Sequence, residues 1–61
     1  MAQITCKELS ALSDLLAMEQ GMVVKCKTYA AETNDTILKD RYEMMAQRHQ
    51  RHFDELYANL K

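Results

Sequence analysis

Two long stretches with apolar residues at helical spacing, joined by a single turn signal, constrain this chain more than any other feature. The chain has no proline and one glycine, so little interrupts a helix except the polar run at residues 33–36. In that run, Asn34 suits the left-handed position that ends a helix, and Asp35 suits the N-cap of the next. Because a connection this short joins antiparallel neighbours, the sequence predicts a helical hairpin.

The expected architecture is all-α, with one domain that covers residues 1–61. Helix one is expected at about 6–33, the turn at 34–35, and helix two at about 36–60. Two signals mark the start of helix one. Thr5 and Glu8 match an S/T-x-x-E capping box, and apolar residues flank that box as a hydrophobic staple does.

Each expected helix carries an ionisable residue in the middle of its apolar stripe, Glu19 in the first and His49 in the second. Within roughly 80° of Glu19 lie Leu9, Leu12, Leu15, Leu16, Met22, Val23, Cys26, Tyr29 and Ala30, and within the same angle of His49 lie Leu38, Tyr42, Met45, Ala46, Phe53, Leu56, Tyr57 and Leu60. Burying either group unpaired costs several kcal/mol. Facing residues across the turn have numbers that sum to about 69, so we expect Glu19 and His49 to approach each other.

The two apolar stripes are too wide for one hairpin to cover. Each helix buries one flank on its neighbour and leaves the other exposed, which marks an interface. The sequence therefore predicts that two hairpins pack by two-fold symmetry into an antiparallel four-helix bundle. The expected homodimer interface consists of Leu12, Leu16, Glu19, Val23, Tyr42, Met45, His49, Phe53 and Leu56.

Carboxylates and imidazoles that point into a bundle are typical metal ligands, so Glu19, His49 and His52 are candidate ligands of a divalent metal such as zinc or iron. A di-iron centre is not expected, because the bundle pattern requires Glu-x-x-His and Ala46 stands where that carboxylate belongs. In the alternative interpretation, Glu19 and His49 bind no metal and only set the helix register through a hydrogen bond.

Several classes of function find no support in the sequence. The net charge is −1 with both signs mixed, which argues against a nucleic-acid partner. No apolar run approaches the roughly 20 residues of a membrane span. Cys6 and Cys26 fall about 30 Å apart on one helix, so we expect no disulfide within the chain. Free cysteines are typical of a reducing compartment, so we expect an intracellular location. No catalytic set of nucleophile and base is visible, so we expect no enzyme.

Four runs of the sequence resemble the Coat F family of spore coat proteins. They are residues 12–19, residues 29–35 with the Asp35 cap, Leu38-Lys39, and residues 49–56 with His49 and His52. The chain departs from the family in having Thr36 where a proline often follows the Asp cap. The resemblance implies a ferritin-like bundle and a coat-associated structural role in a sporulating bacterium, with other coat proteins as partners and the cytoplasm or spore coat as location.

The leading expectation is a non-enzymatic structural or assembly module of the spore coat type. One alternative is a metal-binding, ferritin-like bundle with Glu19 and His49 at its centre. The other is a small regulatory hairpin that binds a partner through its bundle surface. A short basic ridge on helix two, formed by Arg41, Arg48 and Arg51, is the only support for RNA as that partner.

Overall fold

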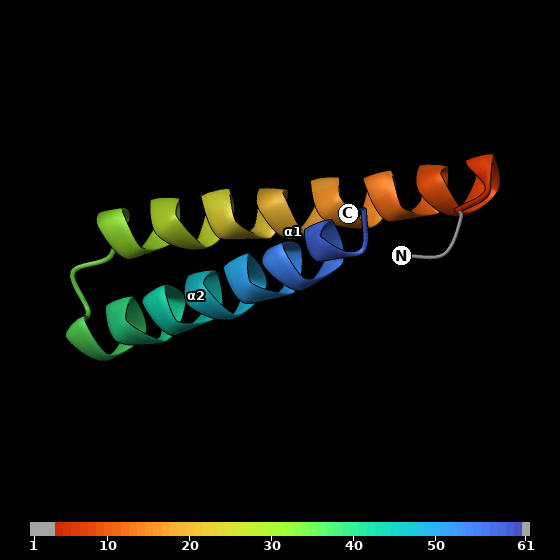
Figure 1. Cartoon of the computed structure of the whole chain (residues 1–61). Helices are drawn as coiled ribbons and strands as arrows, with labels where there is room; N and C mark the ends of the chain where they lie inside the picture. The colour runs from red at the N-terminus through yellow and green to blue at the C-terminus, as the bar shows by residue number, and fades with distance from the viewer. Residues whose placement is uncertain (1–3, 61) are drawn as a thin grey trace.

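Two antiparallel helices make up the computed structural model of the chain, which describes residues 4–60 (Figure 1). Helix α1 spans Cys6–Glu32 and helix α2 spans Thr36–Ala58. No strand occurs in this part of the chain, and the predicted all-α hairpin is confirmed. Within residues 4–60, neither helix is long and apolar enough to cross a lipid bilayer.

Side-chain caps define where both helices begin. The backbone N–H of Glu8 donates to Thr5 Oγ1 over 3.0 Å, and the Thr5 N–H donates to Glu8 Oε1 over 3.3 Å, so the predicted capping box is confirmed. At the start of α2, Asp35 Oδ1 accepts from the N–H groups of Ile37 and Leu38 over 2.9 and 3.1 Å. Each cap satisfies donors that a helix start would otherwise leave unpaired.

The connection between the helices differs from the expectation in one respect. Asn34 was expected in the left-handed conformation, yet no residue other than glycine between 4 and 60 has a positive φ. Instead, Thr33 leaves the helix in an extended conformation, with φ −78° and ψ 142°. Its hydroxyl accepts a hydrogen bond from the Asp35 N–H over 3.2 Å, which turns the chain without a left-handed residue.

The C-terminal end of α2 also differs slightly, since the helix stops at Ala58 and residues 59–60 form a turn. There the N–H of Asn59 donates to the carbonyl of Leu56 over 3.1 Å. This bond spans three residues, as in a 3₁₀ turn, and not the four residues of an α-helix. In Figure 1 this end of α2 lies beside the orange part of α1, so the red first turns of α1 extend beyond it.

Small side chains separate the two helices in the half of the hairpin nearer the turn. Four apolar residues there are buried, namely Val23, Cys26, Ala30 and Ala46, with 3–6% of their surface exposed. Near the turn, the rings of Tyr29 and Tyr42 pack with their centroids 5.5 Å apart. The tyrosine pair thus adds an aromatic contact between the two helices beside the turn.

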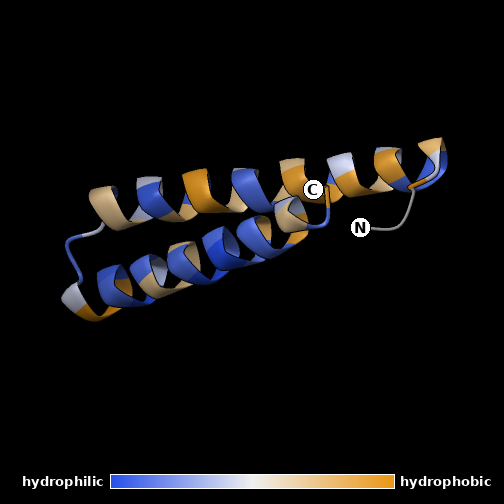
Figure 2. Ribbon diagram, viewed as in Figure 1, coloured by the Kyte–Doolittle hydropathy of each residue, from blue (hydrophilic) through white to orange (hydrophobic). Residues whose placement is uncertain are grey.

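The two sides of this hairpin have opposite character. On one side, a groove is lined by Lys27, Glu43, Ala46, Gln47, Gln50, Arg51 and Asp54, which we call the polar groove. The other side carries Leu15, Met18, Met22, Tyr29, Leu38, Met45 and His52, which we call the open face. Figure 2 shows that more of α1 than of α2 is coloured as hydrophobic.

Candidate metal centre

Glu19 lies near the middle of α1 and faces α2, with only 8% of its surface exposed. Helical periodicity places it there, because it shares the stripe of buried Val23 and Cys26. Its Oε1 atom lies 2.6 Å from Nδ1 of His49, so the imidazole N–H donates a short, charge-assisted hydrogen bond to the carboxylate. The predicted approach of Glu19 and His49 is confirmed, and it occurs within one hairpin.

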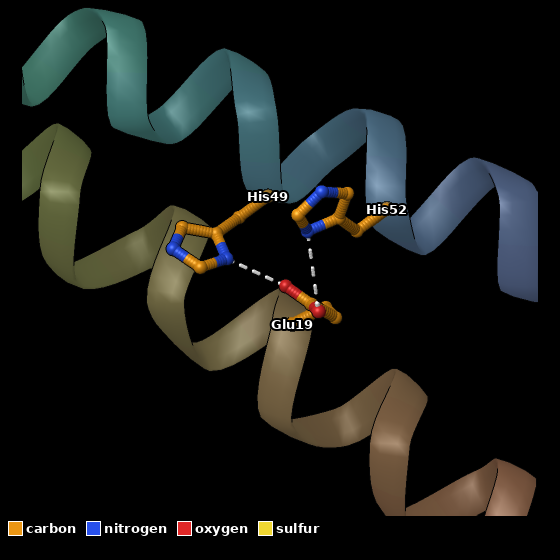
Figure 3. Close-up of polar contacts among 3 residues, drawn as sticks. All are labelled: Glu19, His49 and His52. Carbon is orange, nitrogen blue, oxygen red and sulfur yellow. Dashed lines mark hydrogen bonds and ion pairs between the residues drawn. The ribbon is translucent and has the colours of Figure 1, made fainter.

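His52 completes the cluster from the next turn of α2. Its Nδ1 lies 3.5 Å from the second carboxylate oxygen of Glu19, so the carboxylate reaches a different imidazole with each oxygen (Figure 3). The rings of His49 and His52 stand at 90° to each other, with centroids 5.8 Å apart. Two imidazoles spaced three residues apart on one helix thus converge on one carboxylate of the other helix.

This arrangement could hold a metal ion. Glu19, His49 and His52 each offer one ligand atom, and these atoms all lie within 4.8 Å of one another. Zinc bonds to imidazole nitrogen and carboxylate oxygen are about 2.0–2.2 Å long, so ligand atoms around one ion sit roughly 3.3 Å apart. The present spacing is wider than that, so binding of an ion would require the side chains to close in on it.

Exposure increases across the cluster from α1 toward the open face. The side chain of Glu19 is 11% exposed, that of His49 is 22% exposed and that of His52 is 43% exposed. The carboxylate of Glu19 is therefore largely desolvated, whereas the imidazole of His52 borders solvent. An ion would enter from the side of His52, where a hollow adjoins the cluster.

Glu55 lines that hollow together with Glu19 and His52, and the sequence analysis did not include it. It lies about 120° around the helix from His49, outside the apolar stripe of α2. The available signal was its spacing, since a residue three positions after His52 is a neighbour on the helix surface.

The predicted dimer interface falls partly inside the hairpin. Glu19 and Val23 are buried between the two helices, whereas Met45 is 41% exposed. The remaining six are half-buried, namely Leu12, Leu16, Tyr42, His49, Phe53 and Leu56. These six line the edges of the helix–helix seam, and the interface stays a prediction.

Comparison with known proteins gives no relative for this chain, since no family model, no curated protein and no solved structure matches it. The resemblance to the Coat F family stays an expectation that rests on the residues named above.

Proposed function

We propose that the chain acts as a self-associating structural module in which two hairpins form an antiparallel four-helix bundle. The observation that carries this proposal is the imbalance between buried and exposed apolar residues. Among residues 4–60, four apolar residues are buried, whereas the large apolar residues Leu9, Leu15, Met18, Val24, Tyr29, Ile37, Leu38, Met44, Met45 and Tyr57 are 40–68% exposed. A core of four small or medium side chains is too little to stabilise a chain of this size alone.

The contrast between the two sides supports the open face as the surface on which the proposed second copy packs. Lys27, Glu43, Arg51 and Asp54 line the polar groove, and charged side chains of both signs are well solvated there. The open face presents apolar side chains from both helices, and water is a poor environment for a patch of that kind. A two-fold axis through the open face covers its exposed apolar residues in both copies at once, namely Leu15, Met18, Tyr29, Leu38 and Met45.

Sedimentation velocity over a range of micromolar concentrations tests this proposal. The chain has a mass of 7.1 kDa, and we expect the dominant species to have twice that mass. We also expect helicity and thermal stability to fall together with dimer content on dilution, because folding and association are linked. A folded, thermally stable monomer at micromolar concentration would contradict the proposal.

The biological role that we propose is non-enzymatic assembly of the spore coat type. Its support is the resemblance of residues 12–19, 29–35 and 49–56 to the Coat F family, together with a hairpin suited to self-association. Other coat proteins are the partners that this role implies. A fluorescent fusion should appear during sporulation and collect at the spore surface, and uniform expression in growing cells would argue against the role.

A second proposed function is the binding of a divalent metal, zinc or iron, at the Glu19–His49–His52 cluster. The support is the convergence of three ligand atoms within 4.8 Å. Elemental analysis of protein purified without chelator should find metal in the wild type and none in a Glu19→Leu/His49→Leu double variant. Absence of zinc and iron from the wild type after exposure to both ions would rule this function out.

A further inference from the structure

The hollow beside the cluster contains a second carboxylate whose position the metal-binding proposal does not use. Glu19, His52 and Glu55 line this hollow together with the side chains of Leu15, Leu56 and Asn59. We propose that Glu55 is a fourth ligand, so that one hairpin supplies two imidazoles and two carboxylates to a single zinc-type cation. This inference rests on the proposed metal binding and adds the residue that completes the coordination.

The placement of Glu55 on α2 makes the contact possible without a change of backbone. Residues three apart on a helix have Cβ atoms about 5–6 Å apart, so the flexible carboxylate of Glu55 can reach the exposed edge of the His52 ring. The backbone there is helical, and the carbonyl of Glu55 also accepts a hydrogen bond from Asn59 Nδ2 over 3.1 Å. Glu55 borders the same hollow as Glu19 and His52, so rotation of its side chain can bring the carboxylate toward them.

The carboxylate of Glu55 is also uncommitted, which distinguishes it from its neighbour. Asp54 accepts a hydrogen bond from Gln50 Nε2 over 3.0 Å and belongs to the polar groove. Within residues 4–60, the side chain of Glu55 has no hydrogen bond and no ion pair. Two adjacent acidic residues of α2 therefore differ in their partners and in the side of the hairpin that they line.

The chemistry of the four groups selects the class of cation. Two neutral imidazoles and two carboxylates balance the charge of one divalent ion. Four ligands of mixed nitrogen and oxygen type suit tetrahedral zinc, whereas calcium and magnesium require more oxygen ligands. Apolar Leu15 and Leu56 also border the hollow.

Calorimetric titration with zinc tests the role of Glu55, with Glu55→Gln as the variant and Asp54→Asn as its matched control. Each change removes one negative charge from adjacent positions and keeps the shape of the side chain. We expect Glu55→Gln to weaken zinc binding at least about tenfold, because lost ligands and their supporting groups typically cost that much. We expect Asp54→Asn to change the affinity by less than about twofold, since surface substitutions away from a site have small effects.

Cobalt(II) gives an independent reading of the coordination. The wild type should show the intense visible absorption of tetrahedral cobalt, and Glu55→Gln should shift or weaken it while Asp54→Asn leaves it unchanged.

If the wild type binds zinc and both variants match it, Glu55 is not a ligand, although the three-residue site stands. If both variants weaken binding equally, the effect is one of net charge and the inference is overturned. If the wild type binds neither metal, the inference and the metal-binding function fail together.

Discussion

The two sides of the hairpin are built from the same two helices, yet only one of them resembles a finished protein surface. The polar groove is lined by charges of both signs, with Lys27 from α1 and Glu43, Arg51 and Asp54 from α2. The open face carries apolar side chains and the exposed ring of His52. The difference is the one expected if the polar side faces water and the open face packs against a second copy, as we propose.

Glu19 lies at the border between the two sides, and this position explains its partners. Residues to one side of it on α1, such as Lys27, line the polar groove, and residues to the other, such as Leu15, line the open face. Its carboxylate is turned to His49 and His52. The polar cluster is therefore placed where a second copy on the open face would also cover it.

The sharpest test of the comparison places the same new charge on each side. Met45→Asp puts a carboxylate on the open face, and Gln47→Asp puts one in the polar groove. We expect Met45→Asp to raise the dimer dissociation constant about 100-fold or more, because burial of an unpaired charge costs several kcal/mol. Gln47→Asp should change it by less than about threefold. Sedimentation velocity of both variants measures this, and equal effects would remove the distinction between the two sides.

The next largest effect concerns the border between the sides. With a chelator present, Glu19→Ala or His49→Ala should lower the free energy of unfolding by about 1–3 kcal/mol, because each leaves a partly buried group without its partner. The double change Glu19→Leu/His49→Leu should recover much of this loss if the pair is structural. Urea unfolding at fixed protein concentration measures all four proteins. Alanine variants as stable as the wild type would show that the 2.6 Å contact contributes little.

The two ends of the hairpin offer a smaller test, which asks how far the packed region extends. Asp35→Ala removes a cap at the turn, where both helices are packed, and should cost about 1 kcal/mol. Thr5→Ala removes a cap from the turns of α1 that extend beyond α2 and should cost less, because those turns can fray without loss of packing. Thermal unfolding compares them. A larger cost for Thr5→Ala would mean that the first turns of α1 are covered in the assembled protein.

The smallest expected effect lies on the outer surface of α1, which belongs to neither side. A Cβ atom added at Gly21 meets nothing within 4 Å. Gly21→Ala should therefore stabilise the helix by about 0.5–1 kcal/mol through the lower entropy of the unfolded chain. Thermal unfolding measures the gain. A loss of stability or of dimer would show that another backbone approaches Gly21, and the interface would then have to be moved to the outer surface.

Much of the fold follows from the sequence because helical periodicity and caps are local rules. The capping box at Thr5 and the helix start at Asp35 depend on residues within one turn, and both are present in the structure. The match between Glu19 and His49 follows from counting outward from the turn, because both helices rise equally per residue. The end of α1 was less predictable, since the extended conformation of Thr33 competes with a left-handed Asn34 and small energies separate the two.

The sequence predicts which positions form the candidate site, but it does not predict how their side chains are oriented. Periodicity places His52 on the edge of the stripe, but only side-chain rotation decides that its Nδ1 faces the second oxygen of Glu19. Glu55 was missed because the apolar stripe was the criterion, and a residue on its flank can still reach the cluster. The width of the stripes is the basis for the proposed second copy, whereas the orientation of that copy would depend on contacts between chains that the sequence of one chain does not encode locally.

The three-residue connection at 33–35 has a consequence for how the molecule is made. Closing so short a loop takes well under a microsecond, and the residues that meet first are those beside the turn. We expect the helices to zip together from Tyr29 and Tyr42 toward Glu19 and His49. If the chain dimerises as proposed, we expect the meeting of two chains to be the slow step, so stopped-flow refolding should show a rate that rises with protein concentration. In a cell, the time from synthesis to mature bundle would be set by how often two newly made chains collide.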